Sequence, residues 1–98
     1  MTAQVYEDPE HVKLYVHLKN IGDKTIYTVL SDFTLLTESG QSSQPDISKT
    51  YTTKDHFPSG SLATNSESEG LIIFDTKELP KTLTYEDLSG NKVSVLLP

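Results

Sequence analysis

The stretch HVKLYVHLKN, residues 11–20, alternates apolar and polar side chains along almost its whole length. Four aliphatic residues share one side of an extended chain: Val12, Leu14, Val16 and Leu18. A period of two residues is typical of a β-strand with one face buried and the other in water. Gly22 and Asp23 follow, and both residue types favour tight turns. We therefore predict a half-buried strand that ends in a turn.

Other segments of strand length follow at intervals of roughly 8–12 residues, with turn residues between them. They are residues 25–30, 33–38, 51–57, 70–75, 82–87 and 92–97, while residues 42–50 form a polar loop and residues 62–69 are extended. The run GLIIFD (70–75) is nearly all apolar, which indicates a central strand that begins at Gly70 and is buried on both faces. No window shows an apolar stripe at helical spacing. About seven short strands predict an all-β fold, an antiparallel β-sandwich or a small barrel.

Length and charge limit the classes of function. Ninety-eight residues predict one domain. We place a polar, flexible lead-in at residues 1–10 and a single domain at residues 11–98. The net charge is −6 and all eight basic residues are lysines. This composition lacks the basic footprint of a nucleic-acid-binding protein, disfavours binding to anionic membrane surfaces and offers no arginine for bidentate recognition of phosphate.

Cysteine is absent, so disulfides, thiol catalysis and thiolate metal sites are excluded. The longest apolar run has four residues, which is too short to span a membrane. No glycine-rich phosphate-binding motif is present, and we expect no cofactor. We expect any link to a membrane to come from an anchor upstream of residue 1.

Two pairs of carboxylates are weak candidates for a metal site. Glu67 and Glu69 flank Ser68, so they point to the same face of an extended chain, and Glu86 and Asp87 lie together near another strand end. Loops of a β-sandwich can gather such oxygens around calcium. The chain lacks the dense DxDxDG-like pattern of calcium loops, however, and a solvated acidic rim is the simpler interpretation.

Three residues are weak candidates for binding: Tyr15, His17 and His56. Tyr15 and His17 lie on the polar face of the first strand, and His56 lies in the loop sequence KDHFPSG. Exposed tyrosines can form a platform for a sugar or a peptide, although they also fill strands with the hydroxyl in water. Asp55, His56 and Ser59 are close in sequence, but adjacency does not supply the geometry of a catalytic triad. We predict that the protein is not an enzyme.

Several short patterns occur in an order that resembles a known family. They are Lys19-Asn20-Ile21-Gly22-Asp23, Asp32-Phe33-Thr34-Leu35, Glu38-Ser39-Gly40, the run from Gly70 to Phe74 with Pro80, and Leu83-Thr84-Tyr85. In this order they resemble the bacterial immunoglobulin-like family known as domain of unknown function 4352, over residues 11–97. The family's Leu-x-Pro-Gly segment is matched only loosely, near Leu62.

The resemblance implies an immunoglobulin-like β-sandwich from the extracytoplasmic part of a lipoprotein or membrane-anchored protein of Gram-positive bacteria. It implies no catalytic residues. The family's first strand, ahead of residue 11, looks missing or cut short. A missing strand would leave a sheet edge open to a partner or to a second copy of the chain.

Two classes of function follow from these observations. The first is a non-enzymatic interaction domain at the cell envelope, secreted or held at the surface, that binds a protein or peptide through loops or a sheet edge. The alternative is a domain that binds a small ligand or a metal through loop carboxylates or exposed tyrosines.

Overall fold

The alternating segment forms the middle strand of a sheet in the computed structural model, which describes residues 1–98. Strand β2 (Val12–Lys19) pairs in antiparallel fashion with β1 (Thr2–Tyr6) and with β7 (Glu67–Phe74). The four aliphatic side chains of β2 are at most 7% exposed, and the polar side chains between them lie on the outside of the sheet. The predicted half-buried strand is therefore confirmed.

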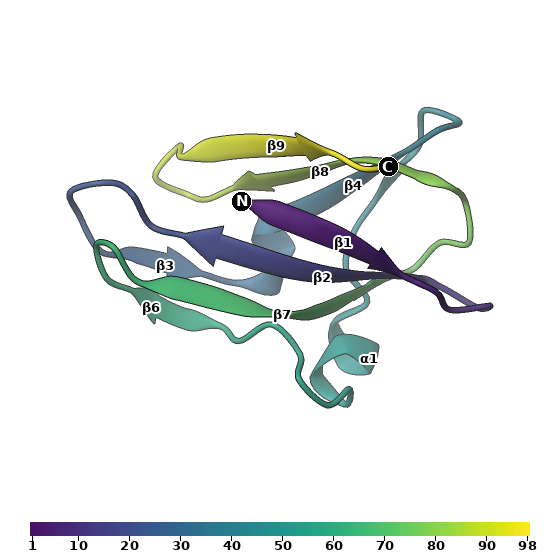
Figure 1. Cartoon of the computed structure of the whole chain (residues 1–98), viewed down its shortest axis with the longest axis horizontal. Coiled ribbons are helices and arrows are strands. Elements are labelled where there is room, and N and C mark those ends of the chain that lie inside the picture. Colours follow the sequence, from purple (N-terminus) through teal and green to yellow (C-terminus); the bar gives the residue numbers. More distant parts are fainter.

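A second antiparallel sheet packs behind the first (Figure 1), in the order β5-β4-β8-β9. Its strands are β5 (Ser42–Ser43), β4 (Phe33–Thr37), β8 (Pro80–Glu86) and β9 (Lys92–Leu96). The short strands β3 (Ile26–Thr28) and β6 (Gly60–Leu62) pair with each other. A 3₁₀ turn, η1 (Leu30–Asp32), leads into β4. The antiparallel β-sandwich is confirmed, and no helix in it has the length and apolar character that crossing a bilayer requires.

The core lies between the two sheets and is centred on aromatic contacts. Phe33 packs edge-on against Phe57 and tilted against Tyr85, with ring centroids 5.2 Å apart in both pairs. Leu14, Ile72 and other aliphatic side chains from both sheets complete a buried cluster of 14 residues. Residues of β1 and β9 pack against this cluster from the strands that end each sheet.

The first ten residues are not only a polar lead-in, and that prediction is wrong. Residues Thr2–Tyr6 form β1, in which Ala3 and Val5 pack against the core while Thr2 and Gln4 are exposed. The alternation is real, but its inward side chains are small and the strand is short, so the sequence signal is weak. The edge of β2 that we expected to be open is occupied.

A short helix, α1 (Ile47–Tyr51), replaces the predicted loop and weak strand around residue 50. Pro45 comes before it, and the carboxylate of Asp46 caps its first turn by accepting a hydrogen bond from the Lys49 N–H at 3.0 Å. An aspartate at this position satisfies a backbone donor that would otherwise have no partner. With only five residues, the helix leaves no apolar stripe in the sequence.

Strand β7 is not the central strand that its apolar run indicated, because residues 44–57 rather than another strand cover its second edge. The Leu71 N–H donates to the Asp55 carbonyl at 2.8 Å, and the Phe57 N–H donates to the Leu71 carbonyl at 2.9 Å. Gly70 lies inside the strand, where a Cβ atom would come within 2.4 Å of the Phe57 backbone nitrogen. Glycine is required there because the covering segment crosses so closely.

Candidate functional site on the outer face of the first sheet

Strand register places a row of side chains across the outer face of the first sheet. Gln4 lies opposite Tyr15, Tyr15 lies opposite Leu71, and Leu71 bridges to His56 in the covering segment. Directly opposed residues in a sheet project to the same face. The row therefore crosses four separate parts of the chain.

Two aromatic pairs lie on either side of Leu71. Tyr6 stacks on Tyr15 with ring centroids 5.9 Å apart and planes 19° apart. Tyr51 meets His56 edge-on at 5.2 Å. Tyr6 and Tyr51 are 42% and 43% exposed, which means that a large part of each ring faces water. We call these five residues, Tyr6, Tyr15, Leu71, His56 and Tyr51, the aromatic face.

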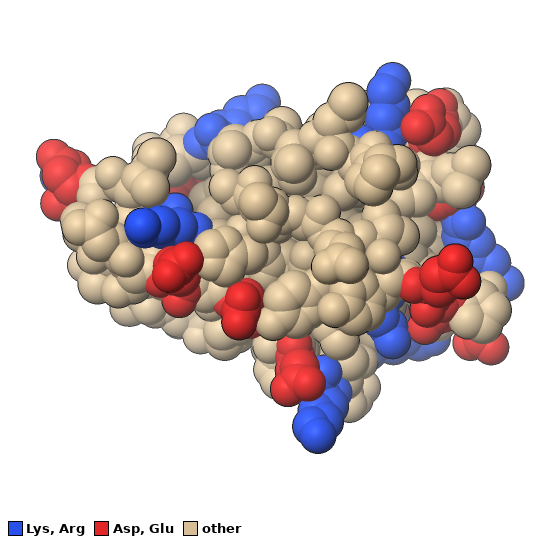
Figure 2. Space-filling model, viewed as in Figure 1, with Lys and Arg blue, Asp and Glu red and all other residues tan.

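Charged side chains lie mostly around this face rather than on it. Figure 2 shows most of the acidic and basic side chains toward the periphery of the view, with a broad uncharged area over β1. His17 Nε2 lies 2.7 Å from Glu67 Oε1, and Lys13 Nζ lies 3.5 Å from Asp8 Oδ2. Glu69 and Asp55 form no ion pair. Partial burial raises the pKa of Tyr15, and the nearby charges of Glu69 and Asp55 raise it further.

All three predicted binding residues therefore come together on one side of the molecule. Tyr15 and His17 alternate along β2, and His56 reaches the same face through its bridge to Leu71. Glu67 and Glu69, predicted as weak metal ligands, are exposed on β7 at the edge of the same face. Whether these residues bind anything stays a prediction.

The second carboxylate pair lies elsewhere, on the other sheet. Glu86 is exposed at the end of β8, and Asp87 is only 8% exposed in the turn that follows. Asp87 accepts hydrogen bonds from the N–H groups of Ser89 and Asn91, from the Asn91 side chain and from the Tyr85 hydroxyl. Its oxygens are thus already used within the turn. No group of three or more histidine or carboxylate side chains is arranged to hold a metal ion.

Asp55, His56 and Ser59 do not assemble into a catalytic trio. The Ser59 hydroxyl lies 2.5 Å from the Tyr51 hydroxyl, and His56 Nδ1 lies 3.0 Å from the Thr53 carbonyl oxygen. No hydrogen bond joins Ser59 to His56, so the serine has no base to activate it.

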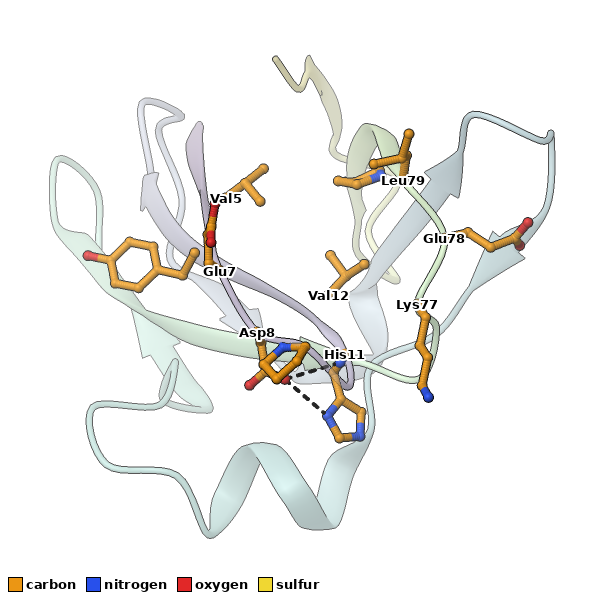
Figure 3. Close-up of a pocket in the computed structure, with 11 residues that line it drawn as sticks. Val5, Glu7, Asp8, His11, Val12, Lys77, Glu78 and Leu79 are labelled. Atoms are coloured by element: carbon orange, nitrogen blue, oxygen red, sulfur yellow. Dashed lines mark hydrogen bonds and ion pairs between the residues drawn. The ribbon is translucent and has the colours of Figure 1, made fainter.

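An open cleft of about 510 Å³ lies at one end of the sandwich, between the β1–β2 and β7–β8 connections. Figure 3 shows Val5 and Val12 pointing into the opening and Glu78 pointing away from it. Asp8 at the rim accepts hydrogen bonds from the N–H groups of Glu10 and His11. These bonds favour its charged form, and the pKa of Asp8 is lowered. None of the residues that the sequence singled out for metal or ligand binding lines this cleft.

The outer face of the second sheet has a different chemistry. Thr34, Thr84 and Ser94 form a row of hydroxyl groups across β4, β8 and β9, in which Thr84 and Ser94 are hydrogen-bonded at 2.8 Å. Leu36 and Leu96 lie on either side of Thr82. No aromatic side chain lies in these rows. The aromatic face is therefore a property of one sheet.

Sequence reasoning did not predict Leu71 on this face, and it considered Tyr6 and Tyr51 only among all the tyrosines that could form a platform, without placing them beside Tyr15. The alternation in residues 2–6 could have placed Tyr6 beside Tyr15 if β1 had been predicted. Leu71 was taken as core, because a continuous apolar run does not tell which of its residues face outward. Tyr51 and His56 depend on the path of residues 44–57, for which no local pattern exists.

Comparisons with known proteins identify a family and a fold. The family model described as domain of unknown function (DUF4352) matches residues 2–93. No curated protein matches the chain. Among solved structures, the 1.5 Å crystal structure of MPT63, a secreted protein from Mycobacterium tuberculosis, is similar with a TM-score of 0.54 and 13% identity. The match covers 98% of this chain and 89% of MPT63, and it shows a shared β-sandwich fold.

Proposed function

The chain belongs to the DUF4352 family, and we propose that it is a non-enzymatic binding domain that meets a protein or peptide partner through the aromatic face. The observation that carries the proposal is the row of Tyr15, Leu71 and His56, flanked by two aromatic pairs, on the outside of a sheet. The outer face of a one-sided sheet is usually polar. Tyrosine is enriched in protein interfaces because its ring supplies apolar area and its hydroxyl supplies a hydrogen bond.

The cellular location belongs to the same proposal. We place the domain outside the cytoplasm of a Gram-positive bacterium, secreted or held at the envelope by an anchor outside the described residues. The resemblance to extracytoplasmic domains of the family supports this location, and the absence of cysteine and the acidic charge are compatible with it. The secreted nature of MPT63 is compatible with it.

A displayed library of random peptides tests the binding face without knowledge of the natural partner. We expect the wild-type domain to enrich peptides that the Tyr15→Ala and Leu71→Ser variants no longer hold. Thr84→Ala, on the outer face of the second sheet, is the matched control and should retain them. Circular dichroism checks that each variant is folded. Peptides that bind all three variants equally well would place the interaction elsewhere and overturn the proposal.

The open cleft favours a second candidate function, the binding of a small apolar ligand. Its volume of about 510 Å³ lies within the usual range of ligand sites, and Val5, Val12 and Leu79 line it. A library of small apolar fragments, tested by methyl NMR, should shift the Val5 and Val12 signals if the cleft binds ligands. Shifts confined to residues near Tyr15 would reject the cleft as a site.

The metal alternative is tested by calcium and zinc titration in a thermal-shift assay, in which an unchanged Tm at millimolar metal contradicts it.

The edge of β2, which we expected to be available for self-association, is covered, but other sheet edges are unpaired. Strand β1 covers β2, and residues 44–57 cover β7, so the longest unpaired sheet edges are those of β1 and β9. We expect a homodimer, if one forms, to use one of these edges. Size-exclusion chromatography with light scattering over a range of concentrations decides between a monomer and a dimer.

A further inference from the structure

Two carboxylates beside the aromatic face have no basic partner within the chain. Glu69 lies on β7 opposite His17 and two residues before Leu71, and the Asp55 carbonyl accepts a hydrogen bond from the Leu71 N–H. The imidazole of His17 lies against Glu67 instead, and Lys13 lies against Asp8. Of the basic side chains on the outer face of this sheet, His17 and Lys13 are therefore already matched, and Lys19, which lies opposite Glu67, forms no ion pair with either acid.

Both acids act on the same aromatic side chain. Burial is the largest cause of the raised pKa of Tyr15, the charge of Glu69 comes next, and the charge of Asp55 adds a smaller effect. The phenol of Tyr15 thus lies in a region of negative potential and stays protonated at neutral pH. Its ring is stacked with Tyr6 on the solvent side of the sheet.

We infer that the partner segment is basic, and that an arginine or lysine side chain of it lies on the Tyr6–Tyr15 pair and reaches Glu69 and Asp55. This inference rests on the proposed function and names the chemistry of its ligand. A cation is attracted to the face of a tyrosine ring, and a carboxylate adds a charge-assisted hydrogen bond. The net charge of −6 favours the same kind of partner at longer range. Arginine suits the site better than lysine, because a planar guanidinium stacks on an aromatic ring and bonds carboxylates at the same time.

The test uses arginine-containing peptides from the selection described above and charge-neutralising variants of the domain. Glu69→Gln and Asp55→Asn keep the size of each side chain, and asparagine tolerates the left-handed backbone of Asp55 (φ 63°). We expect each variant to weaken peptide binding about tenfold, measured by isothermal titration calorimetry. Glu86→Gln makes the same change in net charge on the other sheet and should weaken binding less than about twofold.

A second arm changes the peptide instead of the domain. Replacing its arginine by citrulline, which has nearly the same shape but no charge, should reduce binding to the wild-type domain as much as Glu69→Gln does. The Glu69→Gln variant should then respond less to the citrulline replacement than the wild-type domain does. Selected peptides that depend on Tyr15 but lack basic residues, or that bind equally well with citrulline, would overturn this inference and leave the proposed function standing. The absence of any peptide that depends on Tyr15 would overturn both.

Discussion

Asn20 is 5% exposed although an exposed lysine precedes it and an exposed turn follows it. Its side-chain nitrogen donates to the Lys24 carbonyl at 2.8 Å and to the Leu62 carbonyl at 2.9 Å. Its side-chain oxygen accepts a hydrogen bond from the Gly22 N–H at 3.0 Å. One side chain thus closes the turn after β2 and ties it to the end of β6. Asn20 in the segment Lys19–Asp23 therefore has a structural role.

We predict that Asn20→Ala lowers the free energy of unfolding by about 1–3 kcal/mol, because it removes the buried hydrogen bond to the Leu62 carbonyl and the bonds that close the turn. Urea denaturation measures the change. Asp23→Ala, at an exposed position of the same turn, should shift stability by no more than about 0.5 kcal/mol. Equal effects of the two substitutions would show that the Asn20 clamp does not contribute.

Asp87 is a second buried polar residue with a structural role, at the turn between β8 and β9. Burial disfavours its charged form, but hydrogen bonds from Asn91, Tyr85 and Ser89 outweigh that cost, and the pKa of Asp87 lies below its usual value of 3.8. Burial and the neighbouring Asp87 charge raise the pKa of Tyr85, which keeps its hydroxyl a donor. The carboxylate that we considered as a metal ligand is therefore a turn anchor.

A carboxylate with a lowered folded-state pKa stabilises the fold fully above its unfolded pKa, and this stabilisation is lost as the pH falls through the folded value. We therefore predict that the wild-type protein loses stability below about pH 3.8 in part through Asp87. Asp87→Asn should be less stable at neutral pH and should show a smaller loss in acid. Urea unfolding at a series of pH values measures both effects, and Asp23→Asn controls for the change in net charge. Parallel loss of stability in the wild type and in Asp87→Asn would contradict the assignment.

At the scale of elements, the outer edge of β7 is closed by a side chain as well as by backbone. Thr50 is fully buried in α1, and its hydroxyl both accepts from the Ile73 N–H at 3.1 Å and lies 3.3 Å from the Ile73 carbonyl, to which it donates. The Asp46 N–H also donates to this carbonyl, at 2.8 Å. The Thr50 hydroxyl thus makes the hydrogen bonds to the Ile73 backbone that a neighbouring strand would otherwise make. Helix α1 holds this hydroxyl against the edge of β7.

We predict that Thr50→Val, which keeps the shape of the side chain but removes its hydroxyl, costs about 1–3 kcal/mol and speeds hydrogen exchange of the Ile73 amide. Mass spectrometry or NMR follows the exchange. Thr64→Val, at an exposed loop position, is the control and should leave Ile73 protected. Unchanged protection in Thr50→Val would mean that another group covers this edge.

At the scale of the whole molecule, the sandwich is closed on one side by the first and last strands of the chain. Met1, Ala3 and Val5 at the N-terminus and Val95 from β9 pack against the core cluster. Figure 1 shows β1 in front of the second sheet. The edge of β1 carries no charged side chain, although charges on edge strands commonly prevent unwanted pairing.

We predict that a shortened chain beginning at Glu7 is less stable than the full chain and associates at high concentration, because the edge of β2 is then open. Denaturation measures the first effect, and size-exclusion chromatography with light scattering measures the second. Full-length Gln4→Ala, which changes only an outward side chain of β1, should behave like the wild type. A shortened chain that is monomeric and equally stable would show that β1 is not part of the domain.

The sequence alone determined the fold class and most strands of this protein. Alternation along residues 12–19, the apolar run that ends at Phe74 and the turn residues between strands are local signals, and they report which residues face water. The order of the short motifs also indicated the family. The contacts of Asn20, Asp32 and Tyr85 give these motifs a structural role, because these residues hold turns and strand ends together.

Only the tertiary structure decided where these elements meet. Tyr15, His17 and His56 were separate candidates in the sequence, but their convergence with Tyr6, Leu71 and Tyr51 depends on strand register and on the path of residues 44–57. The same long-range contacts placed a cover on β7 and gave β2 its neighbour β1. The physical reason is that residues 44–57 carry no periodic signal, and that the alternation of β1 is too short to identify a strand by itself. The positions of both segments are set by backbone hydrogen bonds and packing with residues far away in the sequence, which no local pattern records.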